Sequence, residues 1–223
     1  MSKSITSQLI LKDLYLFRWF MVGAVGGSVI ALVAPRMLGV SSDIGLILML
    51  TSIGALAAFI AIYGIMIERK EKSLLFIMSL PVSGTQYAFA KVAAALIAFL
   101  VPWLLLFIAV VSLTLGFDSV PNGRLPSTVA LMMFLLANFS LLVAVMLTVR
   151  SEAGAVAGIL LTNIFISVYM TTVYTRPGIT QHLAGEAIVW SPTVLGILGG
   201  EVAVIVVSLA FAFFIQSRRK DFA

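Results

Sequence analysis

Six long apolar stretches, separated by short polar or charged segments, make up most of this chain. A helix needs roughly 20 residues to cross the roughly 30 Å hydrocarbon core of a bilayer, and each stretch is close to that length. The stretches cover approximately residues 19–35, 44–67, 92–117, 125–149, 153–175 and 193–216. This pattern predicts an all-α membrane protein with six transmembrane helices in a single membrane domain, residues 1–223.

A weaker helical pattern precedes the first stretch. Apolar residues from Ile5 to Phe20 recur every three or four positions, and Gln8, Lys12 and Arg18 tend toward the opposite face. This amphipathic pattern predicts an N-terminal elbow helix in the headgroup layer, because Lys12 and Asp13 would be costly inside hydrocarbon. The alternative is that these residues simply begin the first span.

Composition agrees with a membrane protein and limits its chemistry. Hydrophobic residues make up 61% and charged residues 10% of the 223 positions, and the mean hydropathy is +1.16. No room remains for a folded soluble domain, so any ATPase, receptor or catalytic domain must belong to another chain. The chain has no Cys and one His, His182, which excludes a thiolate nucleophile and a His-cluster metal site.

The distribution of basic residues predicts the orientation. An even number of spans places both termini on one side, and eleven Lys and Arg residues lie on that side against three, Arg36, Arg124 and Arg176, on the other. Cytoplasmic segments carry the excess of positive charge. We therefore expect both termini to be cytoplasmic, in the inner (cytoplasmic) membrane of the cell. The basic residues that give the net charge of +5 flank apolar segments. This distribution favours lipid headgroups over nucleic acid as their binding partner.

One charged block, residues 68–91, separates the second stretch from the third. It opens with charged residues, continues with an apolar run of eight residues, Ser73–Leu80, and is then broken by Pro81. Eight residues cannot cross a bilayer, so the run predicts a short helix on the membrane surface. Its exposed face could dock into a groove on a cytosolic protein.

The order of these features resembles the permease subunits of ABC-2 type transporters. A charged stretch that begins with Glu68 follows span two, and a short apolar helix comes next. The sequence Leu80, Pro81, Val82 and Ser83 follows the helix, and Lys91 stands at the start of span three. The six-span layout, the amphipathic start and a longer outer loop between the last two spans are similar to that family too. The resemblance covers nearly the whole chain.

The resemblance implies a division of labour between chains. The permease is one half of a homo- or heterodimer, and each half works with an ABC-type ATP-binding subunit that holds ATP and Mg²⁺. Residues 68–80 would form the coupling helix, and a second contact would lie between spans four and five. The ATPase-coupling residues are then Glu68, Arg69, Lys70, Glu71, Lys72, Ser73, Leu74, Phe76, Leu80, Pro81, Arg150, Ser151 and Glu152.

The residues themselves give a reason to expect a separate ATPase. No phosphate-binding loop of the Gly-x-x-x-x-Gly-Lys-Ser/Thr type occurs in the chain. We therefore expect this chain to bind no cofactor and not to be an enzyme itself. The sequence leaves the transported substrate open.

Three polar residues inside the spans are candidates for a translocation path, because polar groups in hydrocarbon need partners and often mark a pathway. They are Asn138, Asn163 and Glu201. For the two Asn residues, a hydrogen bond between helices is an equally good explanation. Glu201 could instead be an outer-interface residue that touches water.

Other functions fit less well. An intramembrane protease would need a Ser–His pair, paired carboxylates or a metal site within the spans, and the chain offers none of these. The substrate-binding subunit of a vitamin importer has about six spans but lacks the charged block. A secondary transporter or channel half, working without ATP, remains an alternative to the ATP-driven exporter.

Overall fold

The computed structural model describes residues 5–39, 42–67, 84–116, 120–149 and 151–218, and these residues form an all-α fold. Seven α-helices, one π-helical turn and one 3-10 turn are present in them. The bounds are α1 Ile5–Met37, α2 Ser42–Ala61, η1 Ile62–Met66, α5 Gly84–Gly116, η2 Asn122–Arg124, α6 Leu125–Thr148, α7 Glu152–Val173, α8 Pro177–Thr180 and α9 Pro192–Arg218.

Six of these helical segments are long and apolar enough to cross a membrane, which confirms the six-span prediction. They are Ile5–Ala34, Ile44–Met66, Phe89–Gly116, Asn122–Thr148, Glu152–Val173 and Pro192–Ile215. Five of them agree with the predicted stretches to within about three residues at each end. The first begins earlier than residue 19, because the helix starts at Ile5.

No separate elbow helix is confirmed, since α1 is assigned as one helix of 33 residues. At 1.5 Å per residue its length is about 50 Å, which exceeds the roughly 30 Å of hydrocarbon by several turns. Helix α5 also has 33 residues and runs alongside α1. In a bilayer both helices would therefore extend beyond the hydrocarbon.

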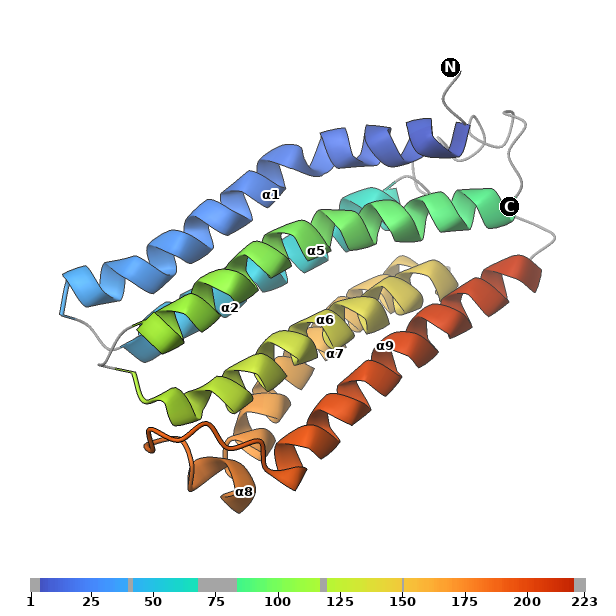
Figure 1. The fold of residues 1–223 in the computed structure, drawn as a ribbon. Coiled ribbons are helices and arrows are strands. Elements are labelled where there is room, and N and C mark those ends of the chain that lie inside the picture. Colours follow the sequence, from blue (N-terminus) through green and yellow to red (C-terminus); the bar gives the residue numbers. More distant parts are fainter. Residues whose placement is uncertain (1–4, 40–41, 68–83, 117–119, 150, 219–223) are drawn as a thin grey trace.

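The long helices alternate in direction along the bundle (Figure 1). One end, here called the termini side, holds the start of α1 and the end of α9. The opposite end, the α8 side, holds α8 and the connection between α7 and α9. Because α1 and α5 both begin at the termini side, they lie parallel to each other, whereas α6 returns beside α9 from the α8 side.

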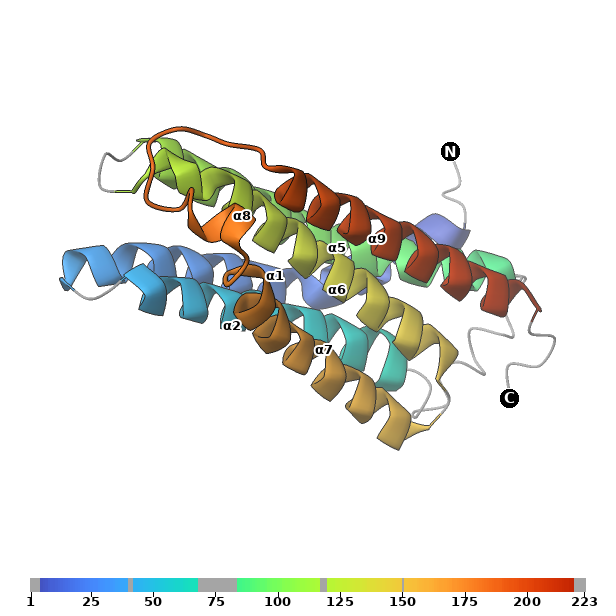
Figure 2. The ribbon, with the colours of Figure 1, turned by 90° about the horizontal axis from the view of Figure 1, so that it is seen from below.

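By their contacts the helices form two groups, α1 with α2 and α5, and α6 with α7 and α9. Figure 2 shows α1 and α2 side by side. Helices α5 and α6 join the groups, and α6 is the most buried of the six spans. Phe99 of α5 stacks on Phe139 of α6 with ring centroids 4.0 Å apart. The Trp103 indole Nε1–H donates to the Met132 carbonyl over 2.7 Å, which adds a polar link to the same interface.

The α8 side is closed by a contact between two connections distant in sequence. The Gly123 amide donates to the Gly185 carbonyl over 2.8 Å. A Cβ on Gly123 would lie 2.0 Å from the His182 carbonyl oxygen and 2.6 Å from that of Gly185. Only a glycine allows the two backbones to approach this closely.

Candidate functional site

The first half of α1 contacts both helices that border residues 68–83. The predicted coupling residues Glu68 to Pro81, and Arg150, lie outside the described residues. The candidate site therefore consists of the described residues that border them. The helix that leads into the segment ends with η1, and the helix that leads out of it is α5. Both lie against α1 at the termini side.

A buried ion pair joins α1 to α5. The Lys91 ammonium donates to Asp13 Oδ2 over 2.7 Å, and the two side chains are 5% and 4% exposed. Lys12 Nζ, on the exposed side, lies 3.4 Å from the other Asp13 oxygen. Leu9, Tyr87 and Ala90 pack together next to this pair. From the sequence, the charge of Asp13 predicted a helix at the membrane surface. In the structure this charge is neutralised by Lys91, which lies 78 positions later in the chain.

The ion pair lies at the level expected for the edge of the hydrocarbon. Asp13 is 24 residues before the end of α1, and Lys91 is 25 before the end of α5. These intervals correspond to about 36 Å and about 38 Å of helix. Both exceed the roughly 30 Å of hydrocarbon measured from the α8 side. The pair fixes α1 to α5, and in a bilayer whose hydrocarbon begins at the α8-side ends of these helices it would lie in the interfacial layer of the termini side.

One turn further along α1, Phe17 fixes the other border of the segment. Its ring is 1% exposed and lies against Gly64, where an added Cβ would be 2.8 Å from the ring. Gly64 belongs to η1, and π-helical turns often occur at functional positions. Phe20, Phe59 and Tyr63 continue this contact as a stack of rings. Helix α1 thus packs against both elements that flank residues 68–83, which are η1 before them and α5 after them.

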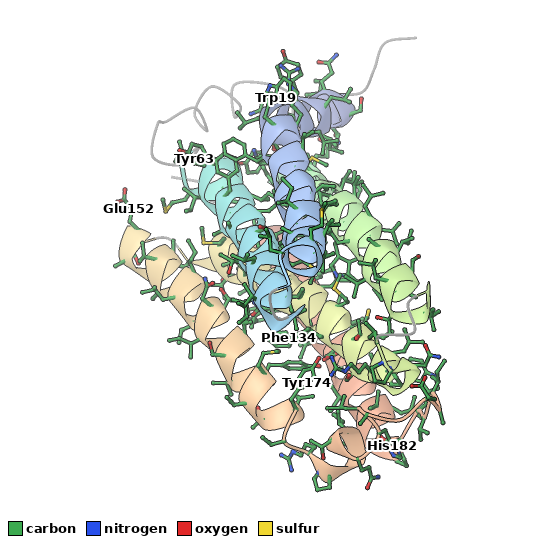
Figure 3. All side chains as sticks on the ribbon, turned by 90° about the vertical axis from the view of Figure 1, so that its left-hand side faces the viewer. Trp19, Tyr63, Phe134, Glu152, Tyr174 and His182 are labelled. Carbon is green, nitrogen blue, oxygen red and sulfur yellow. The ribbon has the colours of Figure 1, made fainter. Side chains whose placement is uncertain are left out.

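Exposed aromatic residues surround this end of the molecule. Trp19 and Tyr63 lie at the termini side (Figure 3), and Trp19 is 69% exposed. The Arg18 guanidinium lies 3.5 Å from the centroid of the Tyr15 ring. Aromatic rings and Arg side chains of this kind are favoured at a membrane interface. Their position agrees with the level inferred for the ion pair.

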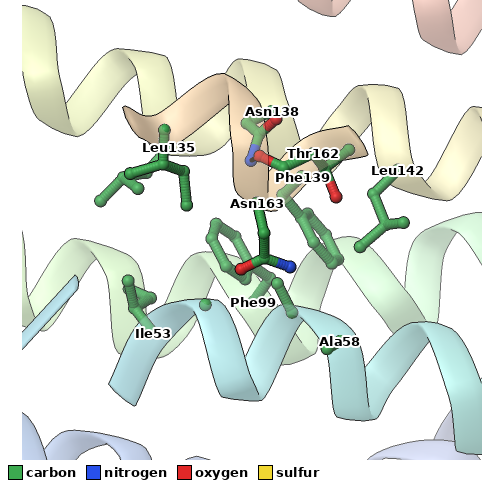
Figure 4. A pocket seen from close by; sticks show the side chains of 12 residues that line it. Ile53, Ala58, Phe99, Leu135, Asn138, Phe139, Leu142, Thr162 and Asn163 are labelled. Carbon is green, nitrogen blue, oxygen red and sulfur yellow. Dashed lines mark hydrogen bonds between the residues drawn. The ribbon is translucent and has the colours of Figure 1, made fainter. Parts of the chain in front are cut away.

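A groove of about 670 Å³ separates α2 from α7. Its α2 wall includes the small residues Gly54, Ala55 and Ala58. Its α7 wall carries Asn163, Ser167 and Thr171, which recur every four residues and so form one stripe along the helix. The groove continues inward to a small cavity of about 20 Å³ next to Phe99 and Phe139 (Figure 4).

The two Asn residues predicted for a translocation path differ in position: Asn138 lies between α6 and α7, and Asn163 faces the groove between α7 and α2. Asn138 of α6 donates from Nδ2 to the Thr162 carbonyl over 3.1 Å, so it bridges α6 and α7. Asn163 is exposed along the groove and donates to the Ile159 carbonyl of its own helix over 2.8 Å. The geometry therefore gives Asn138 a helix-bridging contact and leaves Asn163 on the surface that a ligand could touch.

The second predicted coupling contact is described only in part. Ser151 is the N-cap of α7, and its hydroxyl accepts from the Gly154 amide over 3.1 Å. Glu152 is exposed in the first helical turn, where a negative charge complements the helix dipole. Figure 3 places Glu152 at the same end as Trp19 and Tyr63. Ser151 and Glu152 thus lie at the termini side, as residues 62–67 do.

Glu201 lies apart from this groove and is buried at 6% exposure, between α9 and its neighbours. It does not line the groove between α2 and α7. In the part of the chain that the structure describes, no group of three or more His, Asp or Glu side chains gathers to hold a metal ion.

Two functional features were missed in the sequence. The stripe Asn163, Ser167 and Thr171 has a readable signal, because polar residues four apart share a helix face. The partnership of Asp13 with Lys91 had a weaker signal, which was two opposite charges near the starts of the first and third spans.

Comparison with protein-family models, with characterised proteins and with solved structures gives no match for this chain.

Proposed function

We propose that this chain is the membrane-spanning permease subunit of an ATP-binding cassette exporter of the ABC-2 type. In this proposal a separate ATPase subunit binds residues 68–80, and its hydrolysis of ATP drives movement of a substrate across the cytoplasmic membrane. The observation that carries the proposal is the bracing of both borders of residues 68–83 by α1. A loop that only separates two spans would not require a buried ion pair at its exit.

The bracing supports a mechanical role for the charged segment. A push on residues 68–83 would reach η1 through the preceding residues and α5 through Lys91. Phe17 and Asp13 lie one turn apart on α1, so both movements would be passed to the same rigid helix. Closely packed elements transmit such displacements as rigid bodies. The ATPase movement would in this way tilt α1, η1 and α5 together.

The groove between α2 and α7 is the candidate path in this proposal. Its apolar α2 wall and its polar stripe on α7 suit a substrate that has both an apolar body and hydrogen-bonding groups. A second permease subunit placed against the same face would enclose the groove between two copies. Tilting of α2 through η1 would then change the width of the enclosed space.

The test is reconstitution of the chain in proteoliposomes with a candidate ABC-type ATPase subunit from the same organism. Replacing both Glu68 and Glu71 by Lys should reduce permease-dependent ATP hydrolysis about tenfold or more, because mispaired charges at an interface cost several kcal/mol. Membrane insertion should not change. Glu186→Lys is the matched control, since Glu186 is an exposed carboxylate on the α8 side.

Two results would contradict the proposal. Unchanged ATP hydrolysis in the double variant would remove the role of residues 68–80 in coupling. Transport by the chain alone, without ATP and driven by an ion gradient, would identify a secondary transporter instead.

A further inference from the structure

Glu201 is a buried carboxyl group within a membrane-spanning helix. It lies nine residues after the start of α9, about 13 Å along the helix from the α8 side. Its side chain is 6% exposed, and neither carboxyl oxygen has a hydrogen-bond partner. This burial differs from the water-exposed position that the sequence also allowed.

A second unpartnered polar group lies beside it. Tyr169 of α7 is 9% exposed, and its hydroxyl also has no hydrogen-bond partner. The hydroxyl and the Glu201 carboxyl lie near enough to interact, although no hydrogen bond of ordinary geometry joins them. Phe134 of α6 stacks on the Tyr169 ring with centroids 3.9 Å apart. The two polar groups therefore face each other at the junction of α6, α7 and α9.

No cationic side chain among the described residues neutralises Glu201. Helix α6 carries no charged residue, and the one charge on α5, Lys91, is bound to Asp13 at the opposite end. Helix α8 has no charged residue, and the charge on α7, Glu152, is at the termini side. Charged or titratable groups nearer the α8 side include Arg124, Tyr174, Arg176, His182 and Glu186, with Arg36 and Asp43 at the ends of α1 and α2. The group that acts on Glu201 is Tyr169.

We propose that Glu201 binds a proton at this junction and holds it at neutral pH. An ionised carboxylate that is buried without a counter-ion or hydrogen bonds is much less stable than the neutral acid. The Tyr169 hydroxyl opposes this by favouring the ionised form, but burial is the larger effect. A metal cation would need several more oxygen ligands than these two side chains supply.

The site links α7 and α9 through the side chains of Tyr169 and Glu201. Separation of the two helices would let water reach Glu201 and release the proton, and renewed contact would bind it again. This inference does not depend on the proposed ATPase partner. Its test therefore uses the isolated chain.

The experiment measures reaction with dicyclohexylcarbodiimide, which enters apolar regions and modifies protonated carboxyl groups. The full chain in lipid nanodiscs is treated at pH 7, and the adducts are located by peptide mass spectrometry. We expect Glu201 to be modified about tenfold or more faster than Asp13, which is equally buried but paired with Lys91. Raising the pH should slow the modification of Glu201.

Two controls distinguish burial from protonation. A water-soluble carbodiimide should modify the exposed Glu186 and leave Glu201 unmodified. In infrared spectra, the wild-type chain should show a carboxylic-acid C=O band that Glu201→Gln lacks, and the variant should remain folded because its amide is neutral and of similar size.

The proposal would be overturned by an unmodified Glu201 at pH 7 together with the absence of the carboxylic-acid band. It would also be overturned if Na⁺ at fixed pH raised the melting temperature of the wild type but not of Glu201→Gln. That result would identify a metal-cation site.

Discussion

At the scale of single residues, the Asp13–Lys91 pair is the most informative contact. Two charges removed from water are stable only when their geometry is good, and 2.7 Å between Lys91 Nζ and Asp13 Oδ2 meets that condition. The pair need not add stability over two apolar residues. Its effect is to fix one relative position of α1 and α5, because any slip between them would leave both charges buried and separated.

A pair of variants tests this at the level of stability. Asp13→Asn should lower the free energy of unfolding by about 3–5 kcal/mol, because it leaves the Lys91 ammonium buried without its carboxylate. The double change to Asp13→Leu and Lys91→Met should recover most of the loss. Thermal unfolding in one detergent would measure both. Equal stability of Asp13→Asn and wild type would show that Lys91 finds another partner.

At the scale of elements, α2 and α7 matter through the faces they leave uncovered. Small residues on α2 and polar residues on α7 open a groove, whereas α6 is buried by its neighbours. Gly54 is part of the α2 wall, and an added Cβ there would meet no atom within 4 Å. A larger side chain at this position would therefore occupy the groove without disturbing the packing.

This leads to a prediction for transport. Gly54→Leu should reduce transport about tenfold or more if the groove is the path, because the added side chain would occupy it. A tenfold reduction corresponds to an increase of about 1.4 kcal/mol in the activation free energy of transport. The melting temperature should stay near that of wild type. Gly23→Leu is the matched control, because a Cβ on Gly23 of α1 also meets nothing within 4 Å. An equal loss in both variants would argue against a specific path at Gly54.

At the scale of the whole molecule, contacts distant in sequence close each end of the bundle. Helix α1 holds η1 and α5 together at the termini side, while Gly123 holds the connection before α9 at the α8 side. The helices are thus held by contacts at both ends. Such an arrangement suits a permease that moves rigid helix groups, as proposed above.

The contact at Gly123 can be tested by one methyl group. Gly123→Ala should destabilise the fold by about 1–3 kcal/mol, because the backbones must separate and the Gly123–Gly185 hydrogen bond is lost. Gly185→Ala should cost less, since its Cβ would lie 3.6 Å from the His182 carbonyl oxygen, an ordinary contact. Thermal unfolding compares the two variants. A larger loss for Gly185→Ala would contradict this account of the α8 side.

The sequence by itself determined the six spans, because the need to bury backbone polar groups in hydrocarbon forces long apolar stretches to become helices. It also drew attention to residues 68–91 and to Asn138, Asn163 and Glu201. Which of these residues share a site depends on the rotation of each helix about its axis. Local periodicity sets that rotation poorly when apolar residues occur on every face, as on α2.

Only the tertiary structure decided the partners. It paired Asp13 with Lys91, turned Asn138 toward α7 and Asn163 toward α2, and placed Glu201 beside Tyr169. Each of these contacts joins different helices, and their specificity comes from side-chain packing between those helices. The physical reason is that a buried charge or amide is stable only where the packed fold supplies its partner, and that partner can lie anywhere in the chain.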